Sequence, residues 1–532
     1  MRSLVNRLQF ISLSLAASFS AMAGVNVNNG NFYIAYTDLY LPTRGLNIDV
    51  TRTYNSRSNY VKGYFGVGWS SEIEGYLNFE KSDVVYYEGG GGNVVRFNSS
   101  GKSQWVNNVY GPQSIKKIGS NYQLLAASGK SLIFNEAGKL AKIADRNQNY
   151  LDLVYAKDGR LEMLKDNTNN QIKVSWGNFG SFGRITALEA GDLKARYKYS
   201  PTGDLLEAVG ADAVPFAYEY DDEHNMSKIA YKDGNYKEMK YNKSKDWIIS
   251  FRDKDAMVTS YNYISDTLDP ENKFGTVVNR QQEGSKDKES SRFWYEFRKR
   301  KDGSRYNYRS VTWIRGQVTE TILTECCGTP QAISQWRVDE VPSSDLSQKW
   351  TLSSADKKTT FFEYYNDGLL KKKTSSDGLV TALTYDEKLG KVSTVTKDGR
   401  KIAYKYDTRG NLAEAYDSAN TRNLFLKYSL EGQLVSIQEA KFIGNKQTNS
   451  LVVFNYSAGK LDGIKEKTMD GKDLGVIKIK YDPNGVVTQI QNKEGRTISS
   501  EREMAMAQRV ATTFQNLLEV VQPAGVTLTP EG

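Results

Sequence analysis

The chain contains very little of three residue types on which compact enzymes and small secreted domains often depend. Its 532 residues include two cysteines, one histidine and ten prolines. Two adjacent cysteines cannot supply the disulfide framework that stabilises small secreted domains, nor can they complete a closed zinc site with one distant histidine. We therefore expect no metal and no cofactor. No nucleophile-elbow pattern accompanies His224, so we interpret that residue, within the turn segment 220–225, as structural.

Long apolar runs are also missing beyond the N-terminus. Residues 1–23 resemble a secretory signal peptide, with Arg2 and Arg7 before an apolar core at 8–19 and a small-residue cleavage site between Ala23 and Gly24. No later segment approaches the ~20 apolar residues of a membrane helix, so we expect a secreted, periplasmic or cell-surface protein without a transmembrane segment. Removal of residues 1–23 lowers the formal net charge from +9 to +7. This small excess does not by itself indicate a nucleic-acid partner.

Tyrosine and glycine, by contrast, are abundant and recur together. In the segment 404–412, Tyr404 and Tyr406 lie two residues apart and would leave the same face of a strand. Asp407 and Gly410 then supply the side-chain acceptor and the conformational freedom that a tight reversal needs, and Leu412 begins the next strand. The segment therefore predicts a strand, a turn and a second strand.

The same unit recurs at a nearly constant spacing. From Gly368 the steps to Gly390, Gly410 and Gly432 are 22, 20 and 22 residues, which is about two short strands and two turns per step. Such a period predicts stacked antiparallel hairpins, each of which buries its apolar face against the next. Further copies of the unit begin at Phe134, Tyr155, Tyr197, Tyr218, Tyr364, Tyr385, Tyr428, Tyr456 and Tyr481.

At these residues the chain resembles the YD-repeat family, which includes bacterial Rhs proteins, TccC-type toxin components and animal teneurins. Five N-terminal pieces, ending at Trp69, also resemble in their order the domain that precedes the repeats in Rhs-like proteins. The resemblance implies that the hairpins spiral into a large sheet or β-shell. The resemblance also implies that the N-terminal domain caps the first strand of the array, which would otherwise present an unpaired edge. The five pieces are 29–33, 38–42, 44–46, 51–57 and 66–69.

We therefore predict a mainly β chain with one C-terminal helix. The helix is expected because Ser500 and Glu503 form a capping box and apolar residues then recur at helical spacing up to Val521. The predicted order is a signal peptide at 1–23, an Rhs-like β domain at 24–115, a first YD-repeat array at 116–264, an irregular basic and aromatic β segment at 265–350, a second YD-repeat array at 351–498, and the helix with its tail at 499–532.

The segment 286–315, between the two arrays, is basic and aromatic. It carries ten Lys or Arg against four Asp or Glu. Cationic side chains beside aromatic rings could bind an anionic ligand, or they could be the solvated face of a hairpin around Asp302-Gly303 whose aromatic side chains pack inward. The candidate ligand surface comprises Arg292, Trp294, Arg298, Arg305, Tyr306, Tyr308, Arg309 and Trp313.

The two cysteines, Cys326 and Cys327, are adjacent and precede Gly328. After export they are compatible with a vicinal disulfide, with two thiols or with a link to another chain. We interpret them as part of a structural turn.

The resemblance to toxin-carrying proteins raises the question of a C-terminal cargo. The segment Asp482-Pro483-Asn484-Gly485 is similar to the self-cleavage site of such proteins, but Tyr481-Asp482 places it inside an ordinary repeat, and we expect no toxic domain after it. We expect a non-catalytic scaffold or binding module for an envelope glycan or another protein, with no nucleic-acid partner. Two alternatives remain open: a shell around a separately encoded toxin or effector, and an enzyme that cleaves a surface polysaccharide with two carboxylates.

Overall fold

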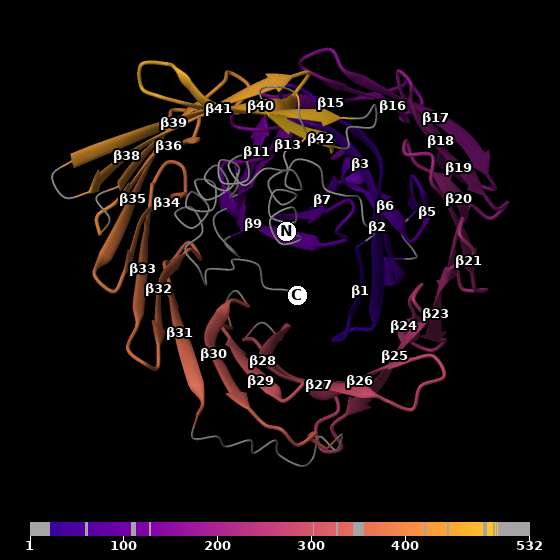
Figure 1. The fold of residues 1–532 in the computed structure, drawn as a ribbon. Helices are drawn as coiled ribbons and strands as arrows, with labels where there is room; N and C mark the ends of the chain where they lie inside the picture. Colours follow the sequence, from indigo (N-terminus) through magenta and orange to yellow (C-terminus); the bar gives the residue numbers. More distant parts are fainter. Residues whose placement is uncertain are drawn as a thin grey trace.

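The protein is built almost entirely from antiparallel strands that follow one another around a circuit (Figure 1). The computed structural model describes residues 22–492, except 59–61, 108–112, 127–128, 302, 326–327, 344–355, 420–421, 444–445 and 482–486, together with residues 495 and 497. Strands β7 to β42 form one sheet of 36 strands. The predicted mainly β fold with a large sheet of hairpins is thus confirmed, whereas the helix predicted at 499–532 lies outside the described residues.

A small N-terminal sheet, here called the plug, lies on the inside of this circuit (Figure 1). Its strands are ordered β1-β2-β3-β6, and a two-stranded ribbon, β4-β5, lies between β3 and β6 in the sequence. Within the described part of the chain, the only helical elements are two short 3₁₀ helices in this region. The bounds are β1 (Met22–Asn26), β2 (Asn31–Leu41), β3 (Ile48–Asn55), η1 (Ser56–Ser58), β4 (Lys62–Gly63), β5 (Gly66–Val67), β6 (Trp69–Ser71) and η2 (Glu72–Glu74).

The large sheet consists of a first limb, a bridging segment and a second limb. The first limb contains β7 (Tyr76–Glu80), β8 (Asp83–Tyr87), β9 (Val94–Gly101), β10 (Gln104–Asn107), β11 (Gln113–Ile118), β12 (Asn121–Leu125), β13 (Ser131–Phe134), β14 (Leu140–Ala144), β15 (Tyr150–Tyr155), β16 (Leu161–Asp166), β17 (Gln171–Phe179), β18 (Phe182–Ala190), β19 (Leu193–Tyr199), β20 (Leu205–Val209), β21 (Pro215–Tyr220), β22 (Met226–Tyr231), β23 (Tyr236–Asn242), β24 (Trp247–Arg252) and β25 (Met257–Ser265). The bridging segment contains β26 (Lys273–Gln282), β27 (Glu289–Lys299), β28 (Arg305–Ile314), β29 (Gln317–Leu323) and β30 (Pro330–Arg337). The second limb contains β31 (Lys358–Tyr364), β32 (Leu370–Ser375), β33 (Val380–Tyr385), β34 (Val392–Lys397), β35 (Arg400–Tyr406), β36 (Leu412–Asp417), β37 (Arg422–Tyr428), β38 (Leu434–Ile443), β39 (Lys446–Ser457), β40 (Lys460–Lys467), β41 (Asp473–Tyr481) and β42 (Val487–Asn492).

The sheet closes on itself at the start of the first limb. The backbone N–H of Leu77, in β7, donates to the carbonyl of Gly138 at 2.8 Å, and the N–H of Leu140 donates to the carbonyl of Gly75 at 3.3 Å. These bonds join β7 to the turn between β13 and β14. The first strand of the large sheet is therefore paired on both sides, which removes the exposed edge that a sheet otherwise presents.

The repeat unit forms its turn through a few side-chain bonds, as Asp407 illustrates. Its carboxylate accepts the backbone N–H groups of Arg409 and Asn411 at 2.9 and 2.8 Å, which fixes the reversal between β35 and β36. Gly410 has a φ of 84° in this turn, a conformation that side chains with a Cβ rarely adopt.

The repeat tyrosine connects each hairpin to an earlier one. The hydroxyl of Tyr406 donates to the carbonyl of Val392 at 2.6 Å, and burial raises the pKa of this tyrosine to about 12. A repeat of this kind anchors its ring at the turn of a preceding hairpin, which helps to set the stacking of successive units. The same bond occurs between Tyr155 and Leu140, Tyr199 and Ile185, Tyr263 and Ile248, Tyr385 and Leu370, Tyr456 and Leu434, and Tyr481 and Leu461.

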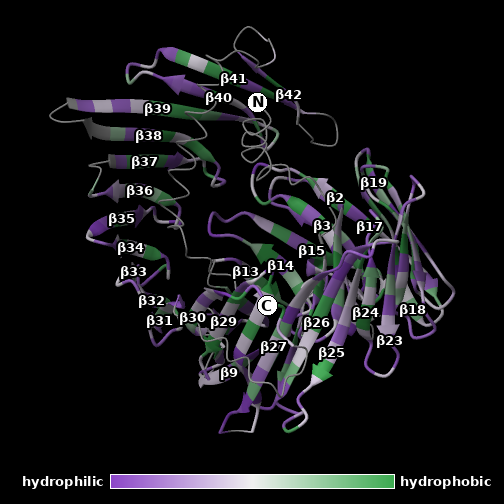
Figure 2. Cartoon of the chain, turned by 60° about the horizontal axis from the view of Figure 1, so that its bottom comes forward, coloured by the Kyte–Doolittle hydropathy of each residue, from purple (hydrophilic) through white to green (hydrophobic). Residues whose placement is uncertain are grey.

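Burial follows the alternation of the strands, and Figure 2 shows hydrophobic and hydrophilic residues alternating along many of them. The buried apolar residues form three separate clusters. One cluster joins the plug to the first limb, a second lies in the second limb, and a small third cluster lies in the bridging segment. In the part of the chain that the structure describes, no helix is long and apolar enough to cross a membrane.

Candidate functional site

The two faces of the bridging segment are identified by one contact with the plug. The Thr276 hydroxyl, in β26, donates to the carbonyl of Val27 at 2.6 Å, so the face that carries Thr276 is the inner face. Thr276 pairs with Phe293, and Phe293 pairs with Thr312, which places these residues on the inner face too. Arg292, Trp294 and Arg298 alternate with them along β27 and therefore belong to the outer face.

The predicted hairpin of β27 and β28 forms, but its aromatic side chains are divided between the two faces. Phe293, Tyr295 and Phe297 face inward, as the alternation predicts. Trp294 and Tyr306 are on the outer face with the arginines, because Trp294 pairs with Val311 and Tyr306 pairs with Arg298.

A bulge between Glu296 and Phe297 shifts the register of this hairpin. It leaves Tyr308 on the side of Arg298, whose guanidinium lies 3.2 Å from the centre of the Tyr308 ring. Bulges reorient side chains in this way, so a strict two-residue period could not predict the position of Tyr308. Seven of the eight predicted surface residues thus share the outer face, whereas Arg305 lies 5.0 Å from the inner Phe297 ring and belongs with the inner side.

At the centre of the outer face is a buried carboxylate held by two cations. Glu320, in β29, accepts hydrogen bonds from the Arg309 Nε at 2.6 Å and from the Lys357 Nζ at 2.8 Å. Burial alone would raise the pKa of Glu320, but the bond from Lys357 and the charge of Arg309 hold it below its usual value. The two cations also lie over Trp294 and Trp336, each 4.8 Å from the ring centre.

These contacts limit what the outer face can bind. Trp313 is buried, with 4% of its surface exposed, and its indole N–H donates to the Val338 carbonyl at 2.7 Å, so it cannot contact a ligand directly. Guanidinium groups already cover the rings of Tyr308 and Trp294. The face therefore presents mainly the N–H edges of stacked arginines, which suit anionic groups. It presents fewer free ring faces on which a neutral sugar could stack.

Arg292 is the least constrained cation of this face. Its Nη1 donates to the carbonyl of its neighbour Ser291 at 3.2 Å, and partial burial lowers its pKa. Its Nε is buried without a hydrogen-bond partner.

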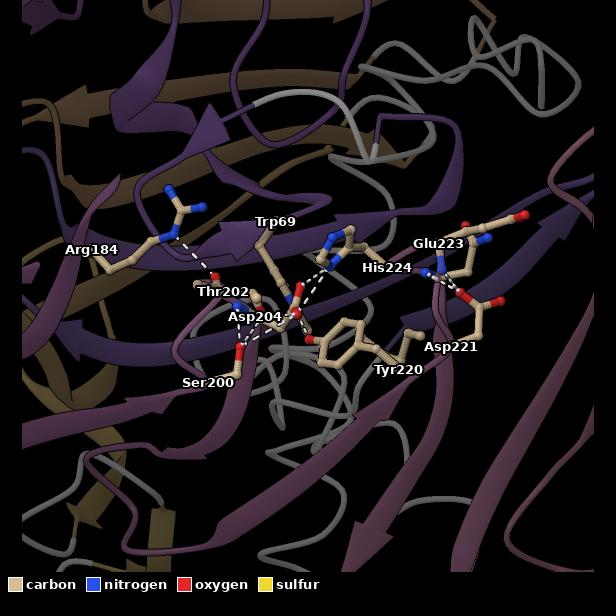
Figure 3. A network of polar contacts seen from close by, with 12 residues as sticks. Trp69, Arg184, Ser200, Thr202, Asp204, Tyr220, Asp221, Glu223 and His224 are labelled. Atoms are coloured by element: carbon tan, nitrogen blue, oxygen red, sulfur yellow. Dashed lines mark hydrogen bonds and ion pairs between the residues drawn. The ribbon is translucent and has the colours of Figure 1, made fainter. Parts of the chain in front are cut away.

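The single histidine joins two turns of the first limb (Figure 3). The Nδ1 of His224 lies 2.8 and 3.0 Å from the two carboxylate oxygens of Asp204, and Asp204 also accepts a bond from the Thr202 hydroxyl at 3.0 Å. The Ser200 hydroxyl bonds to Thr202 and Asp204 rather than to the imidazole. The arrangement connects the β19–β20 and β21–β22 turns and lacks the contact between a hydroxyl nucleophile and a base that a catalytic triad requires.

A buried ion pair at the interface of plug and first limb was not predicted from the sequence. Asp38 and Arg52 lie 2.5 Å apart with side chains 4% and 0% exposed. The Tyr197 hydroxyl donates to Asp38 at 2.9 Å, and the Arg52 Nη2 donates to the Tyr218 hydroxyl at 2.9 Å. Burial alone would lower the pKa of Arg52, yet the Asp38 carboxylate and the tyrosine oxygens raise it well above its usual range.

One sequence signal could have revealed this pair. Val50, Arg52 and Tyr54 share one face of β3, and all three are buried, so a cation stands in a row of inward apolar positions. A charge at such a position requires a partner. The sequence does not indicate that this partner is Asp38, or that the first limb contributes two tyrosines.

A second buried carboxylate, Glu74, organises the loop around β4–β6. It accepts the backbone N–H groups of Tyr64 and Ser71 at 2.5 and 2.8 Å. Burial raises the pKa of Glu74 to about 8. The plug loop is therefore held by a group whose charge changes close to neutral pH.

The remaining predicted residues give no further site. Ala23 and Gly24 belong to β1, while Cys326 and Cys327 lie outside the described residues. Among the residues that the structure describes, no group of three or more His, Cys, Asp or Glu side chains is placed to hold a metal ion.

Comparison with known proteins gives one family match and several similar structures. Residues 23–97 match DUF6531, a domain of unknown function. No protein of curated function matches the chain.

Among solved structures, TcdB2-TccC3 without its hypervariable C-terminal region has a TM-score of 0.45 at 11% identity, over 90% of this chain and 28% of that one. The TcdB2-TccC3-TEV structure has a TM-score of 0.44 at 11% identity, over 93% and 30%. The Tc holotoxin pore of Photorhabdus luminescens with the TccC3 D651A mutation has a TM-score of 0.31 at 12% identity, over 87% and 22%. The chain thus spans less than a third of the length of these structures.

Proposed function

We propose that this protein is an exported, Rhs-like YD-repeat β-shell scaffold that encloses another polypeptide and has no catalytic activity of its own. One observation carries the proposal: a single sheet of 36 strands makes a circuit around a plug formed by the same chain. Such a wall shields what lies inside it from solvent and proteases. The match of residues 23–97 to DUF6531 and the order of the sequence motifs agree with it.

The inner face of the bridging segment suits an enclosed chain. Ser310 and Thr312 of β28 and Thr319 and Thr321 of β29 are inward-facing and only partly buried. Hydroxyl groups can bond to water or to a passing peptide, whereas an apolar wall would bind exposed hydrophobic side chains tightly. The β28–β29 part of the inner face can therefore contact a polypeptide through hydroxyl groups without fixing one conformation, next to the inward Phe293 and Tyr295 of β27.

A photo-crosslinking amino acid placed on each face tests the enclosure. Thr312 is an inward position, and Arg298, whose side chain is 50% exposed, is the outward control in the neighbouring strand. In the producing cell, enclosure predicts protein adducts from position 312 and none from position 298. Adducts from position 298 alone would overturn enclosure and favour surface binding, and the absence of adducts from both positions would contradict any protein cargo.

The second candidate function is binding of an anionic envelope glycan by the outer face. It is favoured by the guanidinium of Arg298, which is stacked on Tyr308 and whose side chain is 50% exposed. Binding to sulfated and uronic-acid glycans should exceed binding to neutral ones, and it should fall with salt. The double variant Arg292→Ala/Arg298→Ala should lose this binding, while equal binding to neutral glycans would refute the assignment.

A further inference from the structure

The two limbs of the shell meet at a second place, far from the bridging segment. The turn 145–149, between β14 and β15, contacts the turns of three hairpins of the second limb, and we call this contact the seam. Arg146 Nη2 donates to the Leu389 carbonyl at 3.0 Å, and Asn149 Nδ2 donates to the Glu431 carbonyl at 2.7 Å. Asn411 Nδ2 donates to the Asn147 amide oxygen at 2.8 Å.

The turn 145–149 is preformed for these contacts. The Asp145 carboxylate accepts the backbone N–H groups of Asn147 and Asn149 at 2.8 and 2.9 Å, and also the Asn149 side chain at 2.7 Å. The amide groups of the turn therefore point to the second limb without reorganisation, as a rigid recognition element does.

Glycines allow the second limb to approach this closely. A Cβ at Gly459 would lie 2.1 Å from the backbone oxygen of Thr43 in the plug, and a Cβ at Gly432 would lie 2.2 Å from the Asn147 amide nitrogen. Other turn glycines of the same limb face open space: a Cβ at Gly378 meets nothing within 4 Å. The absence of a side chain at Gly459 and Gly432 thus serves the seam in addition to the turn.

The seam differs in kind from the rest of the circuit. Along the bridging segment, neighbouring strands are joined by backbone ladders, such as the nine paired residues of β27 and β28. At the seam these hydrogen bonds run between side chains, or from side chains to backbone carbonyls. The buried apolar residues on its two sides belong to separate clusters, so no shared hydrophobic core is described across it.

Two cations lie close together at the seam. Arg146 Nη1 is buried there without a hydrogen-bond partner. Burial lowers the pKa of Lys391, and the neighbouring positive charge of Arg146 lowers it further. The Asp407 carboxylate raises the pKa of Lys391 and so offsets part of the repulsion between these two cations.

We propose that the seam is the opening of the shell, with the turn 145–149 as a latch that releases the second limb from the first limb and the plug. This inference rests on the proposed enclosure. It assigns the route by which an enclosed chain would enter or leave. Opening there breaks a small set of polar contacts, whereas opening elsewhere would break a continuous strand ladder.

Two pairs of variants test the latch in the purified full chain by hydrogen exchange. Arg146→Ala removes a latch contact, and Arg160→Ala, in the next turn along, is its control because the Arg160 side chain bonds to Asn178 within the same limb. Gly459→Ala introduces a clash with the plug, and Gly378→Ala is its control, since their φ angles of 82° and 88° impose a similar backbone strain.

We expect Arg146→Ala and Gly459→Ala to raise exchange about tenfold or more in both 145–149 and 429–433, and to enlarge the hydrodynamic radius. The controls should change exchange only around their own turns. Opening at the seam would be refuted if the latch variants and the controls gave the same exchange at 145–149 and 429–433. It would also be refuted if exchange increased at the seam while the hydrodynamic radius stayed unchanged. This measurement needs no cargo, so its outcome is independent of the crosslinking test of enclosure.

Discussion

The buried pair Asp38 and Arg52 gives a sharp test of how the plug is held. Replacement of Asp38 by Asn removes the negative charge but nearly keeps the shape. Arg52 would then stand fully buried without a counter-charge, surrounded by a neutral amide, the Tyr218 hydroxyl and aromatic rings. Those rings include Trp69, whose centre lies 4.4 Å from the guanidinium.

The expected loss is large for one substitution. Removal of one partner of a buried ion pair typically costs about 3–5 kcal/mol, because the remaining charge is left without compensation. The pair Lys198 and Glu207 is the matched surface control, because its side chains are 72% and 35% exposed and lie 2.8 Å apart in the same limb. Its disruption by Lys198→Ala should cost about 0–1 kcal/mol.

A double variant separates the charge from the hydrogen bonds. In Asp38→Leu/Arg52→Met neither charge remains, so most of the loss seen in the single variant should be recovered. The hydroxyls of Tyr197 and Tyr218 would still lose their partners. A residual loss of about 0.5–1.5 kcal/mol for each lost hydrogen bond, roughly 1–3 kcal/mol for the two together, is therefore expected.

Chemical denaturation of each variant, with hydrogen exchange of β2 and β3 as a local probe, measures these differences. Hydrogen exchange is needed because a chain of this size need not unfold in one step. The stabilising role of the buried pair is refuted if Asp38→Asn lowers the free energy of unfolding no more than Lys198→Ala does. It is also refuted if the double variant is less stable than Asp38→Asn.

Three further outcomes are expected. Since burial raises the pKa of Glu74 to about 8, the folded state binds a proton that the unfolded state has lost, so stability should fall as pH rises from about 5 to 8; thermal melts of Glu74→Gln should lack this slope, and an unchanged slope would exclude Glu74 as its source. Tyr406→Phe should lose about 0.5–1.5 kcal/mol through its missing hydroxyl bond, whereas Tyr416→Phe, a ring 42% exposed, should lose little; similar losses would contradict the role of the repeat tyrosine. Mass spectrometry of the exported chain should give Gly24 as the first residue, and Ala23→Arg should block this processing; an intact Met1 on the exported wild-type chain would refute the signal peptide.

Part of the candidate outer face could be predicted and part could not. Strand alternation is enough to place Phe293 and Tyr295 on one face, because a two-residue period is a property of the strand itself. It did not place Tyr308 beside Arg298, since that position depends on a bulge. Nor did it show that guanidinium groups cover the aromatic rings, which depends on contacts between neighbouring strands.

The sequence by itself determined the local units of this protein. Asp407, Gly410 and the repeat tyrosine act over a few residues or on an adjacent hairpin, and the tyrosine bond to a preceding hairpin recurs in several copies. Strand, turn and stacking order could therefore be predicted from spacing alone.

Only the tertiary structure decided which distant parts meet. Arg52 bonds to Tyr218, 166 residues away, and Asn149 bonds to Glu431, 282 residues away. Contacts of this range depend on the accumulated twist and curvature of many strands, to which every turn and bulge contributes. No local motif encodes that sum, so the plug interface and the seam could be found only when the whole circuit was in place.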